Sequence, residues 1–232
     1  MKTWTVDDVM TTDVVTATPQ MAYRAVVDEL IGRHVSALPV VDDFRRVTGV
    51  VSEADLLRKI EHGDDDRPPR LFESRHRRAS RIKADGHTAA DLMTSPAVTV
   101  LIGTTIPAAA RVMDAKGVKH LPVTDDLGRL VGIVSRSDLL KVHLRPDADI
   151  RADVVQEILR RVLGVEEGKV RVRVGDGVVT LDGRLDRRSA TEIAVRLTRQ
   201  IPGVVEVVTD DLTYDFDDSD LVANRGLPFG VA

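Results

Sequence analysis

Residues 8–57 of this chain are repeated in residues 91–140, at a constant offset and without a gap. Nineteen of the 50 aligned pairs are identical, whereas ordinary residue usage would give about three identities by chance. A unit as short as one copy buries little apolar surface alone, so the two copies are expected to share a core. The duplication therefore predicts one paired module in the N-terminal part of the chain.

Each copy has the sequence pattern of a β-α-β-β-α unit. It opens with a strand-like stretch at 14–16 or 97–99, followed by a helix over Ala25–His34 or Pro107–Lys116. Two strands are then predicted, over LPVVDD and VTGVVS in the first copy and LPVTDD and LVGIVS in the second. Ser52 and Ser135 stand at the N-cap position of a last helix.

The identical positions fall into linked motifs: Met10 and Met93, Leu38–Val40 and Leu121–Val123, Gly49 and Gly132, and two VSxxDLL segments. In this order, twice over, the motifs resemble a pair of CBS motifs, the module often called a Bateman domain, over residues 4–60 and 86–145. The resemblance implies an α/β (α+β) fold. It places CBS motif 1 at 1–60, a linker or helical insertion at 61–87 and CBS motif 2 at 88–145.

In CBS pairs that bind adenine nucleotides, the pattern G-h-h-[S/T]-x-x-D carries ribose and phosphate contacts. Here it reads GVVSEAD at 49–55 and GIVSRSD at 132–138. A carboxylate accepts charge-assisted hydrogen bonds from ribose hydroxyls, and a helix start favours an anionic phosphate. This pattern predicts ligand contacts by Ser52, Asp55, Ser135 and Asp138. The apolar residues expected to sandwich a purine are Val15, Val98, Leu38, Pro39, Leu121 and Pro122. The other predicted contact residues are Thr16, Thr99, Lys119, His120 and Arg136.

The two copies differ at positions close to the expected phosphate. Copy two has Lys119-His120 where copy one has Ser36-Ala37, and Arg136 where copy one has Glu53. In the gamma subunit of AMP-activated kinase, which this region resembles, basic residues here meet phosphate. Since a positive cluster favours phosphate and a carboxylate opposes it, copy two is expected to hold the better site, subject to residues crossing between the paired motifs. The candidate ligands are AMP, ADP, ATP and S-adenosylmethionine.

The same residues also have a purely structural interpretation. The two serines can be plain N-caps, and the aspartates three residues later can complement the helix dipole. The insertion carries seven Lys or Arg and one acid between Arg67 and Lys83. This segment is either a basic patch for phosphate, RNA or an acidic partner, or a solvated helix held by Leu71 and Phe72; the second interpretation is favoured, because no interleaved aromatics support nucleic-acid binding.

After Arg145-Pro146 the pattern changes to an αββαβ unit. Helices are predicted over Ala152–Leu163 and Arg187–Gln200, and strands over Val170–Val174, Val178–Leu181 and Val204–Tyr214. Gly175-Asp176-Gly177 is a hairpin turn signal. The unit resembles a BON domain, at 148–214, a family suspected of binding phospholipid or cell-envelope components. Residues 215–232 are expected to be a flexible acidic tail.

Several classes of function are disfavoured by what the sequence lacks. The absence of Cys removes disulfides, thiolate metal sites and Cys nucleophiles, and no His spacing of the HExxH type or catalytic dyad appears. The N-terminus lacks a signal-peptide pattern and no run reaches the roughly 18 apolar residues of a spanning helix. The net charge of −4 gives no general attraction to nucleic acid or membranes. A non-enzymatic cytoplasmic protein without a cofactor or metal is therefore predicted.

Two functions remain open on the sequence. The first is a regulatory protein whose CBS pair senses an adenine nucleotide and whose BON domain contacts a protein partner, with at most weak membrane association. The second is a ligand-free scaffold that dimerises and uses the BON domain to bind a protein, phospholipid or envelope partner. In both, a homodimer through the CBS pairs is expected, with the helices that contain Ala25–Leu30 and Ala108–Met113 as its interface.

Overall fold

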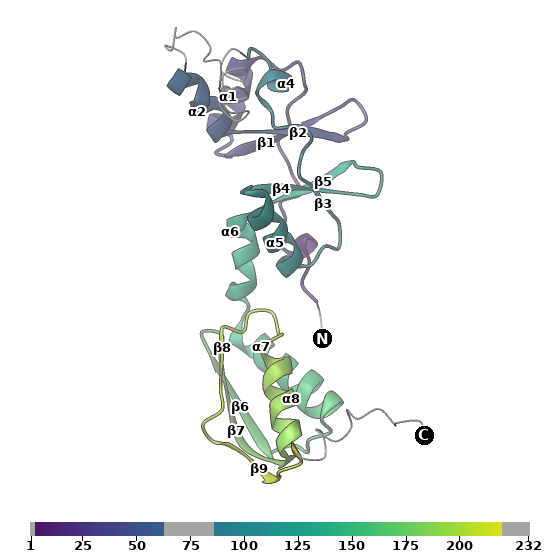
Figure 1. Cartoon of the computed structure of the whole chain (residues 1–232), viewed down its shortest axis with the longest axis vertical. Helices are drawn as coiled ribbons and strands as arrows, with labels where there is room; N and C mark the ends of the chain where they lie inside the picture. Colours follow the sequence, from purple (N-terminus) through teal and green to yellow (C-terminus); the bar gives the residue numbers. More distant parts are fainter. Residues whose placement is uncertain (1–2, 63–85, 220–232) are drawn as a thin grey trace, which may run out of the picture. The chain divides into compact units, whose positions relative to one another are not determined.

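The computed structural model describes residues 3–62 and 86–219, and the predicted helix and basic patch of the insertion lie outside these residues. The described chain is of the α+β class and divides into two compact units. An N-terminal unit holds residues 4–139, and a C-terminal unit begins at Leu140. Each unit has its own hydrophobic core, and each is described separately below (Figure 1).

In the N-terminal unit the two copies fold alike, each as an antiparallel hairpin with its helices (Figure 1). The elements of copy one are η1 (Val6–Asp8), α1 (Tyr23–Gly32), β1 (Ala37–Val41), β2 (Val47–Ser52) and α2 (Glu53–His62). Those of copy two are α4 (Ala89–Leu92), β3 (Val100–Leu101), α5 (Ile106–Lys116), β4 (His120–Thr124), β5 (Leu130–Ser135) and α6 (Arg136–Leu140). The predicted helices and hairpins therefore form close to their expected bounds.

The predicted first strands are displaced along the chain. Residues 14–16 and 97–99 are not in strands. Pairing begins just after them, as the two-residue parallel strand β3 beside β4 in copy two and as a single bridge between Ala17 and Val40 in copy one. Because residues 14–16 and 97–99 take no part in strand pairing, they are available to line a cavity.

The N-terminal segment of each copy packs on the hairpin of the other copy. Thr11 pairs with Ile133 and Thr94 with Val50, as equivalent antiparallel bridges. At the same place the Met10 side chain lies against Gly132, and Met93 lies against Gly49, closely enough that a methyl group on either glycine would collide with the methionine sulfur. The core of copy one includes Ala89 and Leu92 from copy two. The two copies are therefore interlocked through equivalent contacts in both directions.

The C-terminal unit begins with η2 (Lys141–Leu144), α7 (Asp147–Asp153) and η3 (Val154–Val162), and continues with β6 (Val170–Gly175), β7 (Val178–Arg187), α8 (Arg188–Thr198), β8 (Glu206–Val208) and β9 (Leu212–Phe216). β6 is antiparallel to β7, while β8 and β9 both run parallel to β7 and pair with its first and second halves. Inward side chains of β6 and β7 pack with those of α7, η3 and α8 in one core. The β6–β7 turn has Asp176 and Gly177 at φ 51° and 76°, which is the two-residue hairpin geometry predicted for this sequence.

Two details of the predicted C-terminal unit are wrong. The segment Val154–Val162 is a π-helix rather than an α-helix. Val162, expected on the apolar face of this helix with Val155, Ile158 and Leu159, is 57% exposed, and Leu163 packs on the core instead. The second strand, predicted over Val178–Leu181 and expected to end at Asp182-Gly183, does not end there. β7 runs on to Arg187 because β9 pairs with its second half, and the glycine is needed where the Lys169 carbonyl oxygen leaves no room for a side chain.

The predicted third strand and tail also differ from the structure. Residues 204–214 form two strands, β8 and β9, separated by a turn at 210–211. The first residues of the expected tail belong to the fold, because Asp215 lies in β9 and the Asp218 carboxylate accepts hydrogen bonds from Ser189 N at 2.9 Å and Ser189 Oγ at 2.6 Å. These two bonds tie the segment after β9 to the start of α8, so residues 215–219 belong to the fold.

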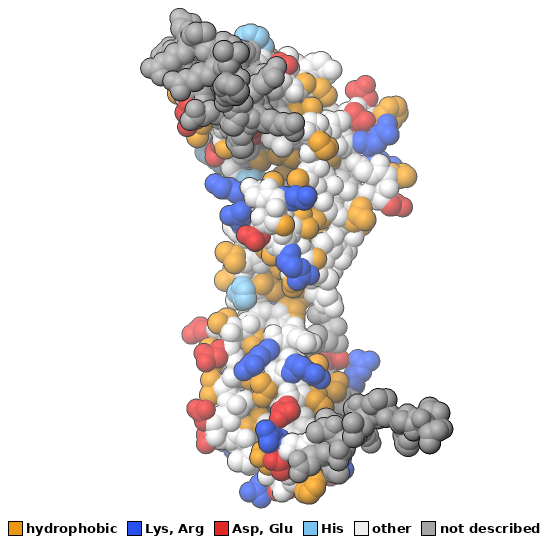
Figure 2. Space-filling model, viewed as in Figure 1, with side chains coloured by type: hydrophobic (Ala, Val, Ile, Leu, Met, Phe, Trp, Pro, Cys, Tyr) orange, Lys and Arg blue, Asp and Glu red, His pale blue; other side chains and the backbone are white. Residues whose placement is uncertain are grey.

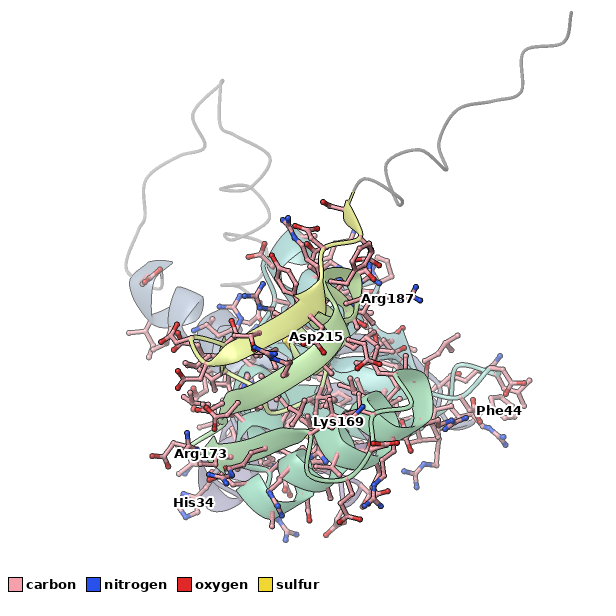
Figure 3. All side chains as sticks on the ribbon, turned by 90° about the horizontal axis from the view of Figure 1, so that it is seen from below. His34, Phe44, Lys169, Arg173, Arg187 and Asp215 are labelled. Carbon is pink, nitrogen blue, oxygen red and sulfur yellow. The ribbon has the colours of Figure 1, made fainter. Side chains whose placement is uncertain are left out.

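The outer face of the C-terminal sheet carries charges of both signs. Arg173 contacts Asp182 at 2.7 Å and Arg184 contacts Asp215 at 3.0 Å. Figure 3 shows Arg173 and Asp215 on this sheet, and Figure 2 shows side chains of both signs on the visible side of the C-terminal unit. The charges of this surface are therefore mixed rather than gathered by sign.

Candidate functional site

Two equivalent cavities lie in the N-terminal unit. The larger, of about 370 Å³, is called the Asp55 cavity, and the smaller, of about 210 Å³, the Asp138 cavity. The Asp55 cavity is lined by Ser36, Val50, Ser52, Glu53, Ala54, Asp55, Thr94, Ala97, Val98, Gly117, Val118, Lys119 and His120. The Asp138 cavity is lined by Thr11, Asp13, Val14, Val15, His34, Val35, Ser36, Ala37, His120, Ile133, Ser135 and Asp138. Most members of one set are the repeat equivalents of members of the other, so the duplication has produced two versions of one cavity.

Each cavity is assembled from both copies. The Ser52–Asp55 motif of copy one faces residues 97–98 and 117–120 of copy two, and the Ser135–Asp138 motif of copy two faces residues 14–15 and 34–37 of copy one. This follows from the interlock, because each N-terminal segment lies on the hairpin of the other copy. The segments at 14–15 and 97–98 supply apolar walls, as predicted from Val15 and Val98.

The expectation that copy two holds the better phosphate site, with its basic residues beside Asp138, is corrected by this crossing over. Lys119 lines the Asp55 cavity together with Glu53, and not the cavity of Asp138. Arg136 lines neither cavity and is exposed at the start of α6. The basic residues that were grouped with Asp138 are thus divided, and among the lining residues of the two cavities the only Lys or Arg is Lys119.

The serine and aspartate of each motif form a local hydrogen-bonded unit at the helix start. Asp55 Oδ2 accepts from Ser52 N at 3.0 Å and from Ser52 Oγ at 2.7 Å, and Asp138 Oδ2 accepts from Ser135 N at 2.8 Å and from Ser135 Oγ at 2.6 Å. Asp138 N also donates to Ser135 Oγ at 3.2 Å, so Ser135 caps the start of α6. A carboxylate has about four acceptor positions on two oxygens, so the same group can hold the helix start and face a ligand hydroxyl.

Several predicted contact residues lie elsewhere. Leu38 and Leu121 are fully buried in the core, as expected for strands whose residues point into packed layers on both faces. The other predicted residues that line neither cavity are Thr16, Pro39, Thr99 and Pro122, with Arg136 as noted. Leu38-Pro39 and Leu121-Pro122 were expected to line the site with Val15 and Val98, whereas the cavities are lined by residues 34–37 and 117–120, which end just before or at the start of these strands.

The wall residues that were not predicted carry a signal in the repeat itself. They include Thr11 and Thr94, Val14 and Ala97, Val35 and Val118, and Ile133 and Val50, which are equivalent pairs. These residues belong to no recognised ligand-binding motif. Their similarity between the two copies is the sequence signal that they occupy equivalent places in two similar cavities.

His120 and Ser36 occupy a special position, because both residues line both cavities. Ser36 Oγ lies 2.9 Å from His120 Nε2, within hydrogen-bond distance. Burial lowers the pKa of His120 below its ordinary value, and the Lys119 charge lowers it further, while Asp138 and Glu53 act in the opposite direction. The imidazole, with its lowered pKa, therefore lies between charges that belong to the two cavities.

Residues 3–62 and 86–219 contain no group of three or more His, Cys, Asp or Glu able to hold a metal ion. Within the same ranges, every helix is too short or too polar to cross a membrane.

Comparison with known proteins agrees with this architecture. The CBS domain family matches residues 6–62 and 89–145, and the BON domain family matches residues 146–215. A CBS domain-containing protein of Dictyostelium discoideum is 31% identical over 111 residues, which are 48% of this chain and 71% of that protein. Inosine-5'-monophosphate dehydrogenase of Mycobacterium tuberculosis is 26% identical over 220 residues, 80% of this chain, but the chain spans only 37% of its length.

A solved structure of CBSX2 in complex with AMP is similar to this chain, with a TM-score of 0.53 and 31% identity. It covers 61% of this chain and 97% of that chain, a share that corresponds in size to the duplicated part. The family matches, the duplicated fold and the paired cavities lead to one conclusion. The chain belongs to the CBS domain-containing proteins, with a tandem pair of CBS domains followed by a BON domain.

Proposed function

We propose that this protein is a non-enzymatic regulator that binds an adenine nucleotide in its CBS pair. The observation that carries the proposal is the construction of two equivalent cavities, each with a Ser–Asp pair at a helix start opposite an apolar wall. The AMP complex of CBSX2, 31% identical at a TM-score of 0.53, supports an adenine nucleotide as the ligand class.

The Asp55 cavity is the preferred nucleotide site in this proposal. Its volume of about 370 Å³ falls within the range of roughly 300–1,000 Å³ common for ligand pockets, while that of the Asp138 cavity, about 210 Å³, is smaller. The Asp55 residue is 6% exposed and lines the cavity, so its carboxylate is suited to the ribose hydroxyls. Lys119 supplies the positive charge for the phosphate, and Val98 the apolar surface for the purine.

Regulation requires that the ligand bind two states of the protein with different affinity. We propose that a bound nucleotide draws the two copies closer together, because the walls of its cavity come from both. A protein partner bound to the BON domain then responds to this change in the CBS pair. The mixed, paired charges on the BON sheet face favour a protein over an anionic lipid surface. This part of the proposal is tested by comparing partner capture with and without nucleotide.

A homodimer through the CBS pairs is also proposed. The residues Val26, Leu30 and Met113 of the helices expected at the interface serve the unit's own core. Exposed apolar side chains lie instead on α2, where Leu57 is 55% and Ile60 is 74% exposed, and a second copy is the occupant we propose for them. Light scattering at tens of micromolar should give a dimer mass that falls to the monomer when both residues are changed to Asp.

The alternative is a ligand-free scaffold, in which the Ser–Asp pairs are only helix caps and the BON domain binds a protein, phospholipid or envelope partner. The bonds from each serine to its aspartate favour a structural role for these groups as well. The two functions differ in one measurable property, which is whether the CBS pair binds a nucleotide at all.

Titration calorimetry of the full chain with AMP, ADP, ATP and S-adenosylmethionine tests the proposal. Asp55→Ala should weaken the tightest site by about 10- to 150-fold, the range for hydrogen bonds to a charged group, and Asp138→Ala should weaken it less. Lys119→Ala should weaken AMP several-fold but leave adenosine unchanged, with Arg136→Ala as a matched control that changes neither. Absence of binding below about millimolar for all four ligands would favour the scaffold.

A further inference from the structure

The helix before each cavity ends in the same way, but the residue at this end differs between the two copies. After α1, His34 N donates to the Ile31 carbonyl oxygen at 3.2 Å. Val35 N donates to the Leu30 carbonyl oxygen at 3.0 Å. α5 ends with the two equivalent bonds, and Gly117 stands there in the place of His34. These bonds form a Schellman motif, in which the residue just after the helix has a left-handed backbone.

His34 therefore has a backbone conformation that glycine adopts more readily. The angle φ is 54° at His34 and 64° at Gly117. A side chain is strained in this region, whereas glycine is not, and strain of this kind is found most often at functional sites. His34 lines the Asp138 cavity and Gly117 lines the Asp55 cavity. Copy one thus adds an imidazole to the Asp138 cavity at the position where the Asp55 cavity has no side chain.

The charges that line the Asp138 cavity oppose a phosphate. Among the described residues of its lining are the carboxylates of Asp13 and Asp138, and no Lys or Arg. The place of Lys119 is taken by Ser36, which with His120 forms the wall that the two cavities share. Burial lowers the pKa of His120, so this imidazole is a poor source of positive charge. A phosphate in this cavity would meet two like charges without a cation to offset them.

We propose that the Asp138 cavity binds an adenine nucleoside that carries no phosphate, with Asp138 for the ribose hydroxyls and His34 as a second polar contact. The inference rests on the proposed function, in which a phosphate-bearing nucleotide occupies the Asp55 cavity, and it adds a second, different ligand. The smaller volume, about 210 Å³ against about 370 Å³, suits a ligand that lacks the phosphate. A neutral imidazole has one hydrogen-bond donor and one acceptor, so His34 can bond to an uncharged ligand.

Equilibrium dialysis of the full chain with labelled adenosine and unlabelled AMP tests this assignment. At about pH 8, where an ordinary imidazole carries no charge, one adenosine per chain should remain bound when AMP saturates the Asp55 cavity. Asp138→Ala should weaken the binding of this adenosine by about 10- to 150-fold, the range for hydrogen bonds to a charged group. Asp55→Ala should instead weaken AMP and leave this adenosine bound, because Asp55 does not line the Asp138 cavity.

His34→Gly separates ligand binding from stability. Glycine is not strained at a φ of 54°, so the melting temperature of this variant should equal or exceed that of the wild type. Adenosine in the Asp138 cavity should nevertheless bind about 2- to 12-fold more weakly, the range for one hydrogen bond between neutral groups. A residue that only ends α1 would not change the affinity. Unchanged adenosine binding in this variant would therefore overturn the role of His34.

Asp13→Asn tests the exclusion of phosphate. Asp13 is exposed, so the substitution removes one of the two carboxylates without disturbing the core. AMP should then displace the bound adenosine at a several-fold lower concentration, because less negative charge faces its phosphate. Asp43→Asn is the matched control, since Asp43 is also exposed but lines neither cavity. If both variants release adenosine at the same AMP concentration, charge does not exclude the phosphate and the assignment is wrong.

The outcomes distinguish this assignment from the proposed function. Displacement of all adenosine by AMP in the wild type, or binding of two AMP molecules per chain with similar affinity, would overturn the assignment while nucleotide binding stands. Binding of AMP without any binding of adenosine would do the same. No binding of either ligand would overturn both proposals.

Discussion

Replacing Gly132 by alanine should test whether the two copies are interlocked. A methyl group at this position would collide with the Met10 sulfur, and it would lie 3.0 Å from Met10 Cγ and 3.1 Å from the Thr11 carbonyl oxygen. Unstrained contacts of this kind lie at roughly 3.5–4.0 Å. The methionine can move, since its side chain is flexible, but the Thr11 oxygen is fixed by the bond that it accepts from Ile133 N at 2.9 Å.

Overpacking of this kind costs about 1–3 kcal/mol of unfolding free energy, and we expect Gly132→Ala to fall in this range. Met10→Ala removes the atoms that collide, so it should cost less in the Gly132→Ala protein than in the wild type. The difference should be about 0.5–2 kcal/mol, within the range for residues in contact. Met93→Ala is the matched control, because Met93 packs against Gly49 and not against Gly132, and its cost should be additive.

Urea unfolding followed by tryptophan fluorescence measures these costs in the full chain. The only tryptophan of the sequence is Trp4, whose carbonyl oxygen accepts from Ile106 N at 3.2 Å inside the N-terminal unit, so its signal reports on that unit. If Met10→Ala instead reduces the unfolding free-energy cost of Gly49→Ala, each N-terminal segment packs on its own copy. The assembly of each cavity from both copies would then be refuted as well.

Three further predictions concern other parts of the chain. Asp218→Ala should lower the melting temperature of the C-terminal unit by a few degrees, as seen by circular dichroism, because Ser189 at the start of α8 loses its acceptor; Asp217→Ala, at an exposed ion pair, should change it less. Gly183→Ala should destabilise the same unit by about 1–3 kcal/mol, since a side chain there meets a backbone carbonyl at a φ of 136°. The lowered pKa of His120 means that the unfolded chain takes up the proton first, so stability should fall as the pH falls below about 6.5; the variant His120→Ala should flatten this part of the urea-midpoint profile.

The element order of the fold could be predicted because local chemistry decides it. Pro107 and Gly117 mark the two ends of α5, and the glycine has the left-handed backbone, φ 64°, that ends a helix. A two-residue hairpin turn requires positive φ angles, and Asp176 and Gly177 both have them. In each case one or two residues have a strong preference that no distant contact needs to supply.

Elsewhere, contacts remote in sequence override the local pattern. The π-helical turn at Val154–Val162 could not be read from a period of 3.6 residues, although the buried positions Ile150, Val154 and Ile158 follow one another at a regular spacing. Gly183 looked like a strand end because its sequence neighbours do not include the Lys169 carbonyl oxygen that it must avoid. A glycine in a strand-like sequence can mark the end of the strand or a close approach of another backbone within it. Which of the two applies depends on a chain segment remote in sequence.

The sequence predicts many residues of the candidate site, but not which copy supplies each wall of a cavity. The constant offset of the repeat identifies Ser52 with Ser135 and Asp55 with Asp138, but equivalence alone does not say which copy faces which. Pairing within a copy and pairing across copies satisfy the same pattern of apolar residues. The choice is made by Met10 and its equivalent, which cross to the opposite hairpin.

The packing of each N-terminal segment on the hairpin of the other copy also affects ligand binding. Each cavity takes its Ser–Asp pair from one copy and its apolar wall from the other, so a single copy contains no complete cavity and both cavities are lost when either copy is removed. A substitution in one copy also acts on the Ser–Asp pair of the other, as Lys119 acts beside Asp55. For this reason, a duplicated chain can make its two sites unequal by a change in one copy alone. The Ser36–His120 wall is the point where such a change affects both sites together.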